Sequence, residues 1–125
     1  MKKLALAAVF AALLPQAASA IGAKQVPVAK GEDVWFAEDH TVPIIALLAA
    51  FPAGSDYDPA AKAGLASFTA ALIDEGAGNL DSRAFQEALA DHAIQLRASV
   101  ERDDLVISVV TLSENAPLAM HLLQT

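Results

Sequence analysis

The chain has 125 residues, of which 55% are hydrophobic and 18% are charged, and it contains no cysteine. This length allows a single domain, and the apolar fraction excludes a disordered chain. The net charge of −7 argues against nucleic-acid binding, which needs clustered Lys and Arg. The absence of cysteine excludes disulfides and thiolate metal sites.

Residues 1–20 have the pattern of a secretory signal peptide. Lys2 and Lys3 provide the positive start, residues 4–14 are uniformly apolar, and Ala18-Ser19-Ala20 provides the small residues of a cleavage site. The apolar run is shorter than the about 20 residues that cross a bilayer, and a buried N-terminal helix explains the pattern less well. We expect cleavage after Ala20, export to the periplasm, and no membrane association of the mature chain 21–125.

The mature chain opens with a polar segment over residues 21–32, and strands are predicted over 33–38 and 42–51. The second strand is apolar on both faces. This predicts either a central place in a sheet, or one face under helices and the other against another domain. Pro43 lacks an amide hydrogen and is expected at the start or edge of this strand.

Asp58-Pro59 predicts the start of a helix that runs to about Asp74, because aspartate caps free amides and proline suits the first helical position. Its buried face is expected to contain Ala61, Leu65, Phe68 and Leu72. Gly76 and Gly78 end this helix.

A second helix is predicted to begin at Asp81 or Ser82, where Leu80 and Phe85 occupy the positions of a hydrophobic staple. Its inner face is expected to contain Phe85, Ala88, Leu89 and His92.

Residues 94–100 alternate between apolar and polar, and residues 105–112 are rich in Val and Ile, so the charged turn 101–104 predicts an antiparallel hairpin. Ser113 or Asn115 is expected to cap a last helix, with Pro117 in its first turn. The order β-β-α-α-β-β-α predicts an α+β fold, with an antiparallel sheet and helices packed on one face.

The residues alone identify no active site. His40, His92 and His121 are far apart in sequence, and a structural or solvated role explains each better than metal binding. Asp56-x-Asp58 lacks the Gly and Glu of a calcium loop, so capping and turn formation are the better interpretation. No serine lies in a Gly-x-Ser-x-Gly elbow, and Gly76-Ala77-Gly78 follows no strand that would make it a phosphate cradle.

Several segments together resemble the N-terminal domain of the insulinase/pitrilysin family of zinc peptidases, and their order and spacing are specific. The segments are Val34–Pro43, Phe51–Ser55, Asp58-Pro59, Gly64-Leu65-Ala66, Asp74-Glu75-Gly76, Phe85–Leu89 and Leu112-Ser113-Glu114. The resemblance covers roughly residues 30 to 125. It implies that residues 21–125 are the first portion of an insulinase-like domain that continues beyond Thr125, and we expect the chain to be a fragment of a longer protein.

In active members of that family, Gly-Leu-Ala is followed by His-x-x-Glu-His, which supplies two zinc ligands and the general base. The resemblance places Ser67 and Ala71 at the two ligand positions and Ala70 at the base. Alanine offers no donor atom and a neutral serine is a poor zinc ligand. The chain is therefore expected to lack catalytic residues, a metal site and any cofactor of its own.

The resemblance implies a non-catalytic periplasmic subunit. Its expected partner is a zinc-bearing homologue, with which it forms a chamber around a peptide substrate. Two alternatives stay open: an independent binding or scaffold protein that retains the fold, and part of a peptidase whose chemistry lies in a missing region. A neighbouring reading frame that encodes His-x-x-Glu-His favours the first hypothesis, whereas zinc and cleavage activity in a longer protein favour the last.

The signal peptide is tested by N-terminal sequencing of the exported protein. Cleavage after Ala20 predicts that the mature protein begins at Ile21. Recovery of the exported protein with Met1 still present would contradict this prediction.

Overall fold

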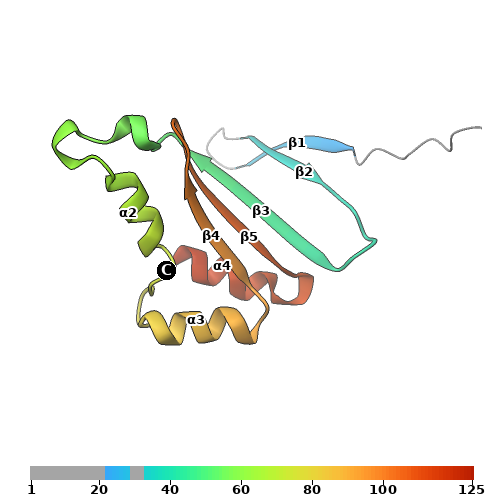
Figure 1. The fold of residues 1–125 in the computed structure, drawn as a ribbon. Coiled ribbons are helices and arrows are strands. Elements are labelled where there is room, and N and C mark those ends of the chain that lie inside the picture. Colours follow the sequence, from blue (N-terminus) through green and yellow to red (C-terminus); the bar gives the residue numbers. More distant parts are fainter. Residues whose placement is uncertain (1–21, 29–32) are drawn as a thin grey trace, which may run out of the picture. The chain divides into compact units, whose positions relative to one another are not determined.

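A computed structural model describes residues 22–28 and 33–125 of the chain (Figure 1). The predicted signal peptide, residues 1–20, lies outside the described residues. The chain divides into a unit that ends at Thr41 and a second unit from Val42 to Thr125. In the part that the structure describes, none of the helices has the length and apolarity needed to cross a membrane.

The first unit contains an antiparallel hairpin of β1 (Ala23–Pro27) and β2 (Asp33–Ala37). Strand β2 was predicted and is confirmed, but the polar segment before it also contains a strand, β1. The sequence did not indicate β1 because its residues, AKQVP, show no apolar alternation, in keeping with a strand that is exposed along its whole length. Pro27 lies at the end of β1, opposite Asp33, where the missing amide hydrogen interrupts little of the pairing.

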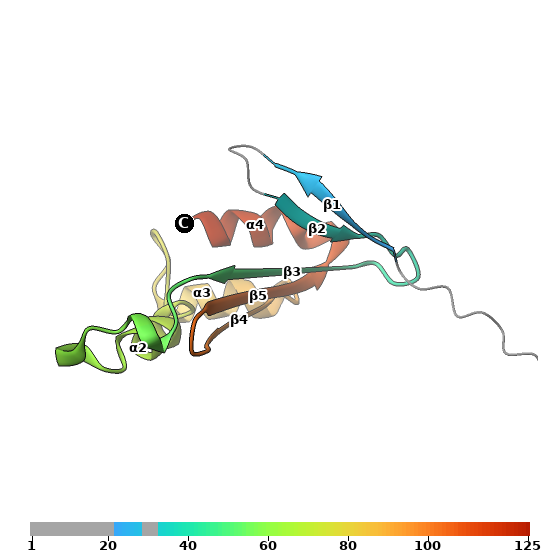
Figure 2. The same cartoon turned by 90° about the horizontal axis from the view of Figure 1, so that it is seen from above.

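The second unit contains an antiparallel sheet of β3 (Ile44–Phe51), β4 (Gln95–Val100) and β5 (Leu105–Leu112), in the order β3-β5-β4. Figure 2 shows β5 between the other two strands. The predicted β4–β5 hairpin is confirmed. A central position for β3 is wrong, since within the described residues β3 pairs with β5 alone.

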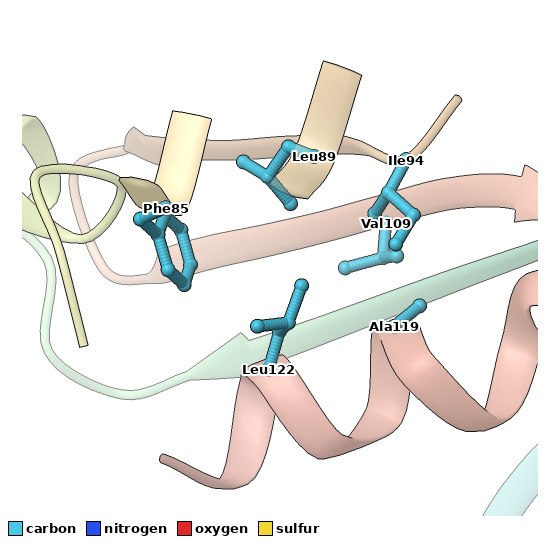
Figure 3. Close-up of a cluster of buried hydrophobic side chains, with 6 residues drawn as sticks. All are labelled: Phe85, Leu89, Ile94, Val109, Ala119 and Leu122. Atoms are coloured by element: carbon cyan, nitrogen blue, oxygen red, sulfur yellow. The ribbon is translucent and has the colours of Figure 1, made fainter. Parts of the chain in front are cut away.

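One face of this sheet is covered by α3 (Ser82–Asp91) and α4 (Ala116–Gln124), and the core lies between helices and sheet. Figure 3 shows side chains from both helices converging on those of the sheet. The core residues are Phe85, Leu89, Ile94, Val109, Ala119 and Leu122. The predicted α+β fold, with helices packed on one face of an antiparallel sheet, is confirmed.

The start of α3 agrees with its sequence signals, but its end does not. The Asp81 carboxylate accepts a hydrogen bond from the Ala84 amide at 2.8 Å, and Leu80 packs against the core. His92, which was predicted on the inner face, is exposed. The reason is that α3 ends at Asp91, and Ala93 takes a left-handed conformation (φ 51°) that turns the chain toward β4.

Helix α2 (Leu65–Leu72) is shorter than predicted, because short 3₁₀ turns over Ser55–Tyr57 and Ala60–Lys62 occupy the stretch before it. Asp58 still caps this helix, but from a distance in sequence: its carboxylate accepts hydrogen bonds from the Gly64 amide at 2.6 Å and the Ala66 amide at 2.9 Å. The capping interpretation of Asp58 is confirmed, and the helix start at Pro59 is wrong.

The predicted buried face of α2 is also wrong. Leu65, Phe68 and Leu72 are 44%, 64% and 48% exposed, whereas Ala70 is buried. Helix α2 packs with the small side chain of Ala70 inward, which allows the helix backbone to lie close to β4.

The last helix is reached through a 3₁₀ turn, Ser113–Asn115, and Pro117 lies in its first turn as predicted. Neither Ser113 nor Asn115 caps α4 through its side chain. Instead, the side-chain amide of Asn115 donates a hydrogen bond from Nδ2 to the backbone carbonyl of His92 at 2.7 Å. This bond ties the end of α3 to the start of α4.

The core predicts a contrast between two phenylalanines. Phe85 is 1% exposed and Phe68 is 64% exposed. We expect Phe85→Ala to lower the free energy of unfolding by about 3–5 kcal/mol, because it leaves a cavity in the core. The matched control Phe68→Ala is expected to change it by less than about 0.5 kcal/mol. Denaturant titrations measure both values, and equal losses would contradict the assigned core.

Candidate functional site

A hollow with polar residues lies between α2 and β4. Its volume is about 510 Å³. From α2 and its C-terminal end it is lined by Ala70, Ala71 and Asp74, and from the sheet by Arg97, Ser99 and Ser108. It therefore combines a small, apolar helix surface with charged and hydroxyl groups.

The three positions that the family resemblance singled out all lie on α2, and two of them line this hollow. Ser67 and Ala71 are one helical turn apart and exposed, which is the arrangement that two metal ligands on one helix face need. Ala70 is 9% exposed. The methyl groups of Ala70 and Ala71 carry no donor atom, so zinc does not fit the residues present.

No alternative set of ligands replaces them in the described ranges. Over residues 22–28 and 33–125, no three His, Cys, Asp or Glu side chains lie close enough to hold a metal ion.

The pair Asp56 and Asp58 has the turn and capping roles expected for it. Asp56 accepts an ion-paired hydrogen bond from the Arg102 guanidinium at 2.8 Å, and Asp58 caps α2. The Asp56–Arg102 pair joins the loop before α2 to the turn between β4 and β5. These contacts help to set the position of α2 beside β4.

His40 lies in an exposed turn and pairs with Glu38, not with the adjacent Asp39. Its Nε2 is 2.9 Å from the Glu38 carboxylate. The side-chain hydroxyl and the amide of Thr41 both donate to Asp39, and these bonds lower the pKa of that carboxyl. A solvated role for His40 is confirmed.

The other two histidines are exposed as well and lie at helix ends. His92 Nδ1 is 3.0 Å from the carbonyl of Ala88 at the end of α3. His121 is in the last turn of α4. Both have the structural or solvated role that the sequence predicted.

The polar wall of the hollow comes from the pairing of β4 with β5. Arg97 lies directly opposite Ser108, and Ser99 follows two residues later on the same face of β4. Within the described residues, the Arg97 guanidinium takes part in no ion pair or hydrogen bond.

This group was not identified from the sequence, although a signal for its pairing was present. A four-residue turn that places Val100 opposite Leu105 also places Arg97 opposite Ser108. The position of α2 beside these residues had no comparable signal.

Asp74 is the second charged residue of the hollow, and it is held in place. Gln86 on α3 donates to the Asp74 carbonyl at 2.9 Å and to its carboxylate at 3.2 Å. The carboxylate is half-buried and has a neutral partner. The hollow therefore contains one oriented acidic group and one cationic group without a partner among the described residues.

Comparisons with known proteins agree on the family. The sequence model of the insulinase family, peptidase family M16, matches residues 34–125. Among solved structures, the inactive domain of a peptidase M16 from Pseudomonas fluorescens is 27% identical, with a TM-score of 0.75. The match covers 82% of this chain and 25% of that one. No curated protein matches the sequence significantly.

The geometry of α2 predicts what restoring two ligands would do. In a Ser67→His, Ala71→His double variant, two imidazoles lie on one exposed face and are expected to bind Zn²⁺ at least about tenfold more tightly than the native chain. The control Ser67→His, Phe68→His has two histidines that do not face each other and should gain little. Competition with a chromophoric chelator measures the affinities. Native zinc binding as tight as that of the double variant would contradict the assignment of these positions.

Proposed function

Because the chain belongs to the insulinase family, peptidase family M16, we propose that it is a non-catalytic periplasmic subunit. It pairs with a zinc-bearing homologue and helps to enclose a peptide substrate. The observation that supports this proposal is the composition of α2: Ser67, Ala70 and Ala71, which the resemblance places at the family's zinc-ligand and base positions, carry no imidazole or carboxylate.

Because the residues at these three positions do not hold zinc, the proposal assigns the zinc and the general base to a partner subunit. A zinc site is worth on the order of 10 kcal/mol of binding free energy, and it does not survive the loss of two ligands. The similar Pseudomonas fluorescens protein is itself described as an inactive domain. A division of labour, with zinc in the partner alone, is consistent with both facts.

Strand β3 is the surface that we propose for pairing. Leu48 is 72% exposed and Ile44 is 47% exposed on one face, and Ile45 is 44% exposed on the other. An exposed apolar edge strand is a site of association unless another protein surface covers it. Contact with a homologous subunit would cover these exposed apolar side chains of β3.

The hollow between α2 and β4 is where we place the peptide. Within the described residues, β4 pairs with β5 alone, so the backbone groups on its other side have no strand partner. An extended peptide can add to such an edge through backbone hydrogen bonds, while its side chains enter the adjacent hollow. The subunit would then position substrate without cutting it.

The pairing is tested by tagging the full-length protein in its native host and identifying the proteins that co-purify. We expect an insulinase-like protein that carries His-x-x-Glu-His, and Leu48→Lys should reduce its recovery at least about tenfold because it places a charge in the interface. The control Leu72→Lys changes an exposed leucine of α2 and should leave recovery unchanged.

Recovery of no His-x-x-Glu-His partner, together with full peptide cleavage in cells that lack the chain, would overturn the pairing. Zinc and cleavage activity in the purified full-length protein would instead favour a peptidase whose chemistry lies in another region.

A further inference from the structure

We propose that Arg97 makes the hollow selective for a carboxylate of the bound peptide. This inference rests on the proposed peptide site and specifies the chemistry that the site recognises. The carboxylate can be an acidic side chain or a free C-terminus, since both present the same two oxygens.

Arg97 differs from the other arginines in its ionic partners. Guanidinium groups favour pairing with carboxylates. The other two arginines have a carboxylate partner: Arg83 on α3 pairs with Glu87, and Arg102 in the turn after β4 pairs with Asp56, each at 2.8 Å. Arg97 alone of these three has no acidic partner in the described residues, and it lines the hollow. Its donors are available to a ligand.

Two serines lie near Arg97 on the sheet. The register places Ser108 opposite it, and strand alternation places Ser99 on the same face. Ser99 and Ser108 therefore lie on the same face of the sheet as Arg97, and all three residues line the hollow. Such a set of donors suits an oxygen anion, and it would be a poor environment for a second cation.

The α2 side of the hollow is lined by small residues. Ala70 and Ala71 occupy little space, which leaves the hollow open to a side chain from a peptide that runs along β4. Asp74 also lines the hollow, but Gln86 already donates to its carboxylate. Asp74 is thus the alternative group for ligand recognition. If Asp74 and not Arg97 selected the ligand, the hollow would favour a basic peptide side chain.

The test uses the purified full-length protein and fluorescein-labelled extended peptides that differ only at a central Glu, Gln or Lys, each with an amidated or free C-terminus. Fluorescence anisotropy measures the dissociation constants. We expect the amidated Glu peptide to bind about tenfold more tightly than the Gln peptide if a side chain enters the hollow. If the C-terminus enters instead, amidation should weaken binding by a similar factor whatever the central residue.

Arg97→Gln should remove that preference, whereas Arg97→Lys should retain part of it, since lysine keeps the charge and loses the bidentate geometry. Arg83→Gln is the matched control on α3 and should keep the full preference. Arg97 is exposed, so circular dichroism should show that Arg97→Gln melts as the native protein does.

Equal binding of all peptides, or a preference that survives Arg97→Gln, would overturn the role of Arg97 and leave the peptide site intact. Tighter binding of the Lys peptide would overturn it too and assign recognition to Asp74. Failure of every peptide to bind would instead overturn the proposed peptide site, and the carboxylate preference with it.

Discussion

The packing of Val109 is the interaction on which the second unit depends. Val109 lies in the middle of β5, the strand that pairs with β3 on one side and β4 on the other. Its side chain is 4% exposed and lies in the cluster with Phe85 of α3 and Leu122 of α4. One residue thus joins the sheet to both covering helices, which are far apart in the sequence.

The position of α2 follows from this arrangement and from two aspartates. β5 sets the register of β4, and Asp56 pairs with Arg102 in the turn between these strands. Asp58, two residues later, caps α2. The helix is therefore held next to β4 by its N-terminal side, and the hollow lies where its small residues face the strand. Ala70 and Ala71 keep the space open and exclude zinc ligation at the same time.

Most of the fold followed from local sequence signals. The β4–β5 hairpin, the Asp81 cap and the Leu80–Phe85 staple each involve residues close in sequence, so periodicity and capping chemistry are sufficient to predict them. The predictions that were wrong concern features that depend on contacts between residues far apart in the sequence. The apolar periodicity of Leu65, Phe68 and Leu72 pointed to a buried face, but tertiary packing placed Ala70 inward.

The residues of the candidate site also divide into those that local sequence predicts and those that depend on distant contacts. Family resemblance identified Ser67, Ala70 and Ala71, because a motif on one helix can be found from a short sequence. Arg97 and Ser108 meet through the hairpin register, which the turn length implies. Their position opposite Ala70 and Asp74 depends on the path of the chain between β3 and α3, and no local pattern encodes that path.

The central claim is that the hollow between α2 and β4 binds peptide without metal. Amide hydrogen exchange of the full-length protein, with and without saturating Glu-containing peptide, tests it most directly. We predict added protection in Gln95–Val100, with the same result in the presence of a chelator. Protection confined to other strands, or protection that appears only when Zn²⁺ is added, would contradict the account.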